Sequence, residues 1–231
     1  MHEVVGTAGP SYHRDTVNYT GDAEPAVLHV FDMDGTLLPK TSANIEIARH
    51  TGTLEAVLSL ENAFALGQID TWDFARGVFD LWGIVHPETV RNVYRMAPKL
   101  RHVRKTVDKI HENGGRAIVI TMSPDFFADH FLELGFDAVV ASKFPRDHAE
   151  PLLLEQILTP RDKPALAWHY CDYFGFAQNS IVAYGDSRSD RPLFEVAQQS
   201  IAINADHHVR SIATHIYDGD SLWDAYELAN E

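Results

Sequence analysis

Cysteine is nearly absent from this sequence, since Cys171 is the only one among 231 residues. A single cysteine excludes an internal disulfide and fits a reducing compartment. Apolar runs of membrane-spanning length are also missing. The first residues are polar and lack the apolar centre of a signal peptide, so residues 1–25 are interpreted as an N-terminal arm. We therefore expect a soluble, cytoplasmic protein that does not enter a membrane.

Positive charge is scarce as well. The chain has 19 Lys and Arg against 33 Asp and Glu, a formal net charge of −14, and no run of basic residues. This balance argues against nucleic acid and anionic membranes as partners. None of the 13 histidines has the spacing of a zinc site. Any phosphate site must therefore create its positive potential locally, from a metal ion, a lysine or helix N-termini.

Two aspartates follow the first apolar run of the chain. The segment 27–31 is β-branched and has the length of a buried strand, and it leads into Asp32, Asp34 and Gly35. In open α/β sheets the chemistry lies at the carboxyl ends of strands. A carboxylate is a competent nucleophile, but it needs a cation such as Mg²⁺ to approach an anionic phosphate. The alternative interpretation is an acidic turn without a catalytic role.

The remainder of the chain reads as helices, followed by alternating strands and helices. Four short helices are expected between residues 39 and 98, with Leu81 among their inward residues. Later strands are expected at 117–121, 138–141, 181–184 and, last, 201–203, with helices at 101–112, 124–134 and 162–173. Residues 152–158 fit a strand or a hairpin. This order predicts an α/β fold, a doubly wound, Rossmann-like parallel sheet. The expected domains are a core of residues 26–38 and 99–231 and an inserted helical cap of residues 39–98.

Two further polar stretches follow predicted strands. Thr121, Met122 and Ser123 precede a helix, where a hydroxyl and backbone N–H groups can form a phosphate cradle. Asp186 and Asp190 lie four residues apart where another predicted strand ends. Each stretch also has a purely structural interpretation, as an ordinary strand end with an N-cap or as a capped turn.

One lysine stands where the helix dipole disfavours it. Lys163 begins a predicted helix capped by Asp162, and a cation at a helix N-terminus is unfavourable. The placement therefore calls for an explanation, and a solvated surface lysine is the purely structural interpretation. Lys143 is the serious alternative to Lys163 as a lysine with a functional role.

The stretch Asp32-Met33-Asp34-Gly35-Thr36 resembles the signature of the haloacid dehalogenase (HAD) superfamily of phosphohydrolases. The resemblance extends over about residues 26–206 and is most similar to the phosphoserine-phosphatase-like branch (subfamily IB). It implies that Asp32 attacks phosphorus and becomes an aspartyl-phosphate, while Asp34 is the general acid and base. An acid at position 34 favours a phosphatase over the dehalogenase and phosphonatase branches. A phosphotransferase or mutase, and a non-catalytic phosphate-binding protein, stay open as alternatives.

The resemblance also assigns the remaining site residues, grouped by what they would bind. Phosphate would be held by Thr121, Met122, Ser123 and Lys163, and Mg²⁺ by Asp32, the backbone carbonyl of Asp34, and Asp186, with Asp190 supporting the metal site from behind its ligands.

The expected substrate is a small phosphorylated metabolite rather than L-phosphoserine. The branch reads the substrate's amino group with a Glu shortly after the nucleophile, and residues 39–44 contain no acid. Ser189 also replaces the Asn that the branch has before its last acid. Arg76 and Lys40 are the candidates for specificity, because they suit a second anionic group. Aromatic residues of the cap are expected to form its core: Trp72, Phe79 and Trp82. The oligomeric expectation is a monomer or a homodimer.

Overall fold

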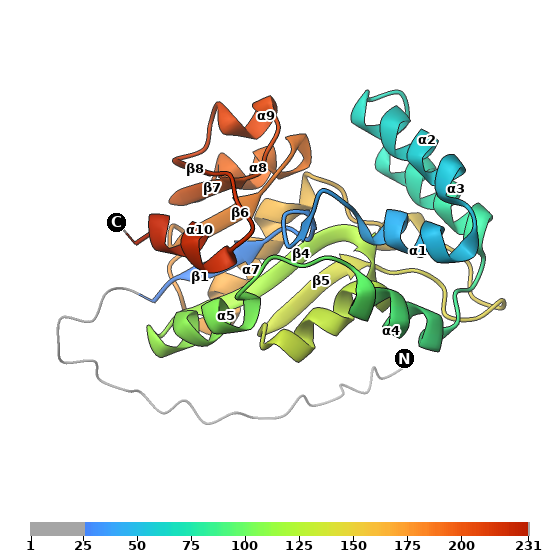
Figure 1. Ribbon diagram of the computed structural model, residues 1–231. Helices are drawn as coiled ribbons and strands as arrows, with labels where there is room; N and C mark the ends of the chain where they lie inside the picture. Colours follow the sequence, from blue (N-terminus) through green and yellow to red (C-terminus); the bar gives the residue numbers. More distant parts are fainter. Residues whose placement is uncertain (1–25, 231) are drawn as a thin grey trace, which may run out of the picture.

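A six-stranded parallel sheet forms the centre of the computed structural model, which describes residues 26–230 (Figure 1). The strand order is β5-β4-β1-β6-β7-β8, so the first strand lies inside the sheet. Every pairing is parallel. The strands are β1 (Leu28–Phe31), β4 (Arg116–Pro124), β5 (Ala138–Ser142), β6 (Ile181–Gly185), β7 (Gln199–Ile203) and β8 (His215–Tyr217). The predicted doubly wound α/β fold is confirmed, whereas the predicted N-terminal arm lies outside the described residues.

Helices cover both faces of this sheet because side chains of successive strand residues point to opposite faces. Phe31, Val119 and Tyr184 belong to the apolar cluster of one face, and Val30 and Ile118 to that of the other. The longer helices of the two layers are α5 (Val103–Glu112), α7 (Asp162–Phe174) and α10 (Leu222–Leu228). The shorter ones are α6 (Asp125–Ala128), α8 (Arg191–Phe194) and α9 (His207–Arg210). No helix among residues 26–230 is both long and apolar enough to cross a bilayer.

Four helices lie between β3 and α5 in the chain; α2 and α3 stand apart from the sheet, whereas α1 contacts β4 (Figure 1). They are α1 (Ala43–Thr51), α2 (Leu54–Ala65), α3 (Thr71–Trp82) and α4 (Pro87–Met96). The first three share an apolar cluster built around Ala48, Val57 and Val78, against which Trp72, Phe79 and Trp82 pack. The α4 residues Val90 and Val93 instead join the main core. The division of the chain into a core and a cap at residues 39–98 stays a prediction.

Four expected features differ in the structure. Residues 152–158 form no strand but a 3-10 turn at Leu154–Gln156. Leu154 is exposed, whereas Ile157 is buried in the same apolar cluster as Ala48, Val57 and Val78. The expected inward residue Leu81 is 37% exposed. Strand β8 follows the one predicted as last, and its exposed centre, Ile216, explains its weak sequence signal. The helix expected at 124–134 begins at Asp125 and becomes a 3-10 helix after four residues.

A buried histidine lies in the central strand. His29 is 6% exposed, and its Nδ1 atom is 3.0 Å from the Tyr184 hydroxyl. Burial lowers the pKa of His29 to about 3, against an ordinary value of 6.5. The native state therefore keeps the ring neutral, while the unfolded chain takes up a proton below pH 6.5. The contribution of His29 to the free energy of unfolding is fully present above pH 6.5 and is lost as the pH falls towards 3.

We expect the His29→Gln variant, which keeps a hydrogen-bonding group but cannot titrate, to lose this pH dependence. Between pH 6 and pH 4 the free energy of unfolding of the wild type should fall by about 1.4 kcal/mol per pH unit more than that of the variant. Urea unfolding at three pH values measures both slopes. Parallel slopes would show that His29 is protonated in the native state.

Candidate active site

Asp32 lies at the carboxyl end of β1 and is bound by a buried lysine. The backbone N–H of Asp32 donates to the Tyr184 carbonyl at 2.9 Å, which continues the pairing of β1 with β6. The Lys163 Nζ donates to Asp32 Oδ1 at 2.7 Å and to Asp190 Oδ1 at 2.6 Å. Lys163 is 1% exposed in the first turn of α7. Two carboxylates thus compensate a cation that the helix dipole disfavours.

Asp186 and Asp190 complete a cluster of three carboxylates. Asp186 follows β6, and Asp190 ends the 3-10 helix Arg188–Asp190. Together with Asp32 they offer carboxylate oxygens that all lie within 4.8 Å of one another. Oxygen donors at this density suit a hard divalent cation such as Mg²⁺. Asp190 Oδ2 accepts from the N–H groups of Asp186 and Ser187 at 3.0 and 3.2 Å, so both of its oxygens already have partners.

Gly35 makes room for this cluster. A Cβ atom at position 35 would lie 2.0 Å from Asp186 Oδ2, and the backbone has a left-handed φ of 81°. A side chain here would collide with the carboxylate that is best placed to bind a metal ion. The glycine of the Asp-Gly-Thr stretch is therefore required by close approach as well as by its turn.

The carboxylates carry more charge than the lysine neutralises. Burial, together with the charge of Asp190, raises the pKa of Asp32 to about 8. Burial and Asp32 likewise raise the pKa of Asp186. Burial opposes the charge of Lys163, but Asp190 and Asp32 outweigh it and hold the Lys163 pKa above its ordinary range. A divalent cation would offset the excess negative charge and favour the ionised form of both aspartates.

Asp34 lies in a separate small pair of strands, β2 (Asp34–Gly35) and β3 (Leu38–Pro39). Its Oδ1 accepts from the Ala43 N–H at 2.6 Å and its Oδ2 from the Thr121 hydroxyl at 3.1 Å. Burial raises the pKa of Asp34, while the hydrogen bonds from Ala43, Ser123 and Thr121 act against the rise. A raised pKa favours the protonated form of the carboxyl group, which is the form that can donate a proton.

Thr121 and Ser123 lie in the last four residues of β4, beside β1, and the strand runs past Thr121, where it was expected to end. The strand continues to Pro124 with a register irregularity after Ile120. The Ser123 N–H donates to Thr121 Oγ1 at 3.1 Å, and both side chains are buried. Met122, between them, is partly exposed. The helix that follows, α6, has four residues, so the predicted cradle depends on the strand end rather than on a helix dipole.

The structure separates the two candidate lysines. Lys163 is buried against Asp32, whereas Lys143 is exposed. The first residue of α7 is Asp162, but its carboxylate accepts from the N–H and hydroxyl of Thr159 instead of capping the helix. Among the specificity candidates, Arg76 is exposed on α3, and the exposed Lys40, with φ 62°, lines a surface depression with Asn204, Gly219 and Asp220.

Three residues beside the site were not predicted as site residues from the sequence: Ser42, Asn44 and Glu61. The Ser42 hydroxyl donates to Glu61 Oε1 at 2.6 Å, and Asn44 Nδ2 donates to Ser123 Oγ at 3.4 Å. Asn44 and Glu61 belong to no motif. The packing of α1 brings Asn44 to Ser123 on β4, and the packing of α2 against α1 brings Glu61 to Ser42. The one available signal for Glu61 was its position, because helical periodicity places this acidic residue on the partly buried face of its helix.

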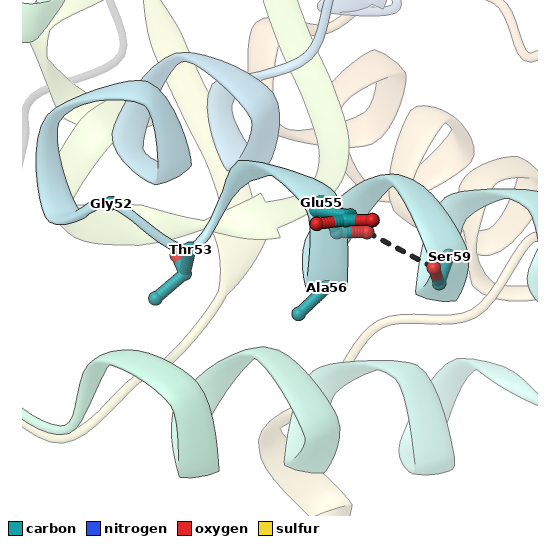
Figure 2. Close-up of a pocket in the computed structure, with 5 residues that line it drawn as sticks. All are labelled: Gly52, Thr53, Glu55, Ala56 and Ser59. Atoms are coloured by element: carbon teal, nitrogen blue, oxygen red, sulfur yellow. Dashed lines mark hydrogen bonds between the residues drawn. The ribbon is translucent and has the colours of Figure 1, made fainter.

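A surface depression of about 440 Å³ lies elsewhere, at the start of α2 (Figure 2). Figure 2 shows Gly52, Thr53, Glu55, Ala56 and Ser59 around it, with Ser59 bonded to the Glu55 carbonyl. None of the residues that line it is among the carboxylates, hydroxyls or lysine described above. The depression has one carboxylate, Glu55, and no lysine or cluster of carboxylates among its lining residues, so the candidate site is the carboxylate cluster around Lys163.

The fold and the site together define an α/β protein with a cluster of acidic side chains at the carboxyl edge of a parallel sheet. The model of the haloacid dehalogenase-like hydrolase family matches residues 29–195. The chain belongs to this family, which confirms the predicted superfamily.

The similar proteins agree with the family. A phosphoserine phosphatase from Archaeoglobus fulgidus is 23% identical over 189 residues, which are 80% of this chain and 55% of that protein. The chain thus spans about half the length of this curated relative. A structure described as a phospho-aspartyl intermediate analogue of phosphoserine phosphatase has a TM-score of 0.77 at 19% identity, covering 89% of this chain and 99% of that one. A HAD-family hydrolase from Salmonella enterica serovar Typhi has a TM-score of 0.78 at 20% identity, with coverages of 87% and 72%.

Proposed function

We propose that this protein is a Mg²⁺-dependent phosphatase that hydrolyses a small phosphate monoester through an aspartyl-phosphate on Asp32. The observation that carries the proposal is the position of Lys163 between Asp32 and Asp190 inside a buried cluster of carboxylates. In this arrangement a carboxylate that can act as a nucleophile, a fixed cation and further carboxylate oxygens lie at one strand edge, which supports the proposal. The names of the family and of the similar proteins support the same reaction class.

The proposed reaction has two halves. In the first, an Asp32 oxygen forms a bond to phosphorus while the ester bond breaks, and Asp34 donates a proton to the departing alkoxide. In the second, Asp34 takes a proton from water, the water oxygen bonds to phosphorus, and the Asp32 carboxylate is released with inorganic phosphate. The hydroxyls of Thr121 and Ser123, the backbone of Met122 and the Lys163 ammonium group would hold the phosphoryl oxygens.

The donor set fits a metal ion. Asp32, Asp186 and the backbone carbonyl of Asp34 would bind Mg²⁺, which offsets the negative charge of the nucleophile and the phosphate when bound. Because both Asp190 oxygens have partners, Asp190 would act on the metal site by positioning Lys163 and the Asp186 backbone. The cytoplasmic location and the monomer or homodimer stay predictions.

Removing the metal ion should stop the reaction. We expect EDTA to silence the wild type and Mg²⁺ to restore it. Asp186→Ala should raise the Mg²⁺ concentration for half-maximal activity steeply, because a direct ligand is lost. Asp190→Asn should raise this Mg²⁺ concentration less, by about 10- to 100-fold, as is usual for residues that hydrogen-bond to the metal ligands without binding the metal themselves. Titration of phosphate release against Mg²⁺ measures both.

Asp172→Asn, a change at an exposed aspartate on α7, is the matched control and should titrate as the wild type does. Full activity after exhaustive chelation would exclude the metal site described here.

A further inference from the structure

The carboxylate of Glu61, on α2, contacts Ser42, and the residue after Ser42 contacts the proposed general acid, Asp34. The N-cap residue of α1, Ser42, donates its hydroxyl to Glu61 Oε1 at 2.6 Å. The next residue, Ala43, donates its N–H to Asp34 Oδ1 at 2.6 Å. Burial raises the pKa of Glu61 to about 7, and the charge of Asp34 adds to the rise although the Ser42 hydrogen bond opposes it. Glu61 therefore faces the same small region as the catalytic carboxyl group.

Glu61 lacks a cationic partner. Among residues 26–230, no lysine, arginine or histidine forms an ion pair with it, and its one side-chain partner is a neutral hydroxyl. Glu46 on the neighbouring helix α1, by contrast, pairs with Arg49 at 3.5 Å. Glu61 is half-buried, and a partly desolvated carboxylate without a counter-charge is costly. Such a group is best explained by a cation that arrives with a ligand.

A buried acceptor without a partner lies two residues after Ser42, at Asn44. Asn44 is 5% exposed, and its Nδ2 donates to Ser123 Oγ, the hydroxyl assigned to the phosphoryl group. Its Oδ1 is buried and has no hydrogen-bond partner among the described residues. Buried polar atoms are nearly always paired, so this oxygen also calls for a donor. Lys163, the one lysine or arginine within residues 26–230 that pairs with a carboxylate of the site, already donates to Asp32 and Asp190.

We propose that Glu61 and Asn44 form a subsite for an ammonium group on the leaving portion of the substrate. This inference rests on the phosphatase function proposed above and names its substrate class, the phosphate monoesters of amino alcohols that carry no second anionic group. An ammonium group has three donors and no acceptor, which matches a carboxylate and an orphaned amide oxygen. A carboxylate in the same place would be repelled by Asp34 and Glu61.

Three esters of equal length separate charge from shape: 2-aminoethyl phosphate, 2-hydroxyethyl phosphate and 2-phosphoglycolate. With Mg²⁺, the wild type should show a kcat/KM for the amino ester about tenfold or more above that for the hydroxyl ester. The carboxylate ester should be the poorest. Glu61→Gln, whose amide oxygen can still accept from Ser42, should reduce the amino ester to the level of the hydroxyl ester. Glu55→Gln, on the exposed face of the same helix, is the control and should keep the preference.

A binding measurement on inactive protein separates this inference from the function on which it rests. In an Asp32→Asn background, Glu61→Gln should weaken the affinity for 2-aminoethyl phosphate about tenfold or more and leave that for inorganic phosphate unchanged. Equal effects on both ligands, or a preference for the carboxylate ester, would overturn the subsite. If Mg²⁺-loaded wild type hydrolyses none of the esters nor p-nitrophenyl phosphate, the phosphatase proposal itself fails.

Discussion

Asp32→Asn is expected to lower kcat for any phosphate ester on the order of 10³-fold or more, because a neutral amide is a poor nucleophile. The fold should survive the change. The amide oxygen of the substituted side chain can still accept from Lys163, and the exchange preserves the shape of a side chain that is 6% exposed. It also removes one negative charge from a cluster in which burial already raises the pKa of Asp32. The variant should therefore unfold at a urea concentration no lower than that of the wild type.

Steady-state phosphate release with p-nitrophenyl phosphate measures the loss, and circular dichroism with urea unfolding monitors the fold. Asp172→Asn, an exposed position on α7, controls for the chemistry of the exchange. Substantial turnover by a pure, folded Asp32→Asn preparation would exclude Asp32 as the nucleophile.

Lys163→Met should have the second-largest effect, on activity and stability together. The exchange keeps a long, unbranched side chain but removes the cation that both Asp32 and Asp190 contact. Breaking a buried ion pair by deleting one partner typically costs about 3–5 kcal/mol. Activity should be lost as well, because nothing else among the described residues would balance the nucleophile before a phosphate arrives.

The pH dependence of that cost follows from the shifted carboxyl groups. The pKa values of Asp32 and Asp186 are raised, so the native state binds protons more readily than the unfolded chain does. Stability lost through these groups is therefore recovered as the pH falls from 8 towards 5. The Lys163→Met variant should be most destabilised at pH 8 and least at pH 5 in urea unfolding.

The matched control is Lys143→Met, at the exposed lysine that the sequence leaves as an alternative. It should retain the stability and the activity of the wild type. A Lys143→Met variant that loses activity while Lys163→Met keeps it would reverse the assignment of the two lysines.

The sequence was sufficient where each functional group follows its own strand. Asp32, Thr121 and Asp186 come at or near the ends of apolar runs, and parallel pairing brings such ends to one edge. The sequence also showed that Gly35 ends the strand segment, but it did not show the close approach of Gly35 to Asp186. Local pattern and the geometry of a parallel sheet thus account for the centre of the site.

The sequence was insufficient where contacts depend on packing between distant helices. Glu61 reaches Ser42 across 19 residues and Asn44 reaches Ser123 across 79, and no periodicity encodes either distance. Strand β8 was missed because its central residue, Ile216, is exposed and its run has three residues. The end of β4 was predicted too early, at Thr121, because the strand continues through Ser123 to Pro124 with an irregular register that alternation alone does not reveal.

Acid quenching of a phosphoenzyme tests the central claim most directly. The Mg²⁺-loaded protein is mixed with p-nitrophenyl phosphate labelled at phosphorus, quenched within the first turnover, digested and mapped. The account predicts an acid-stable, hydroxylamine-labile label on the peptide that carries Asp32, and no label in Asp32→Asn. A label on any other peptide, or rapid hydrolysis without a labelled protein at any quench time, would contradict it.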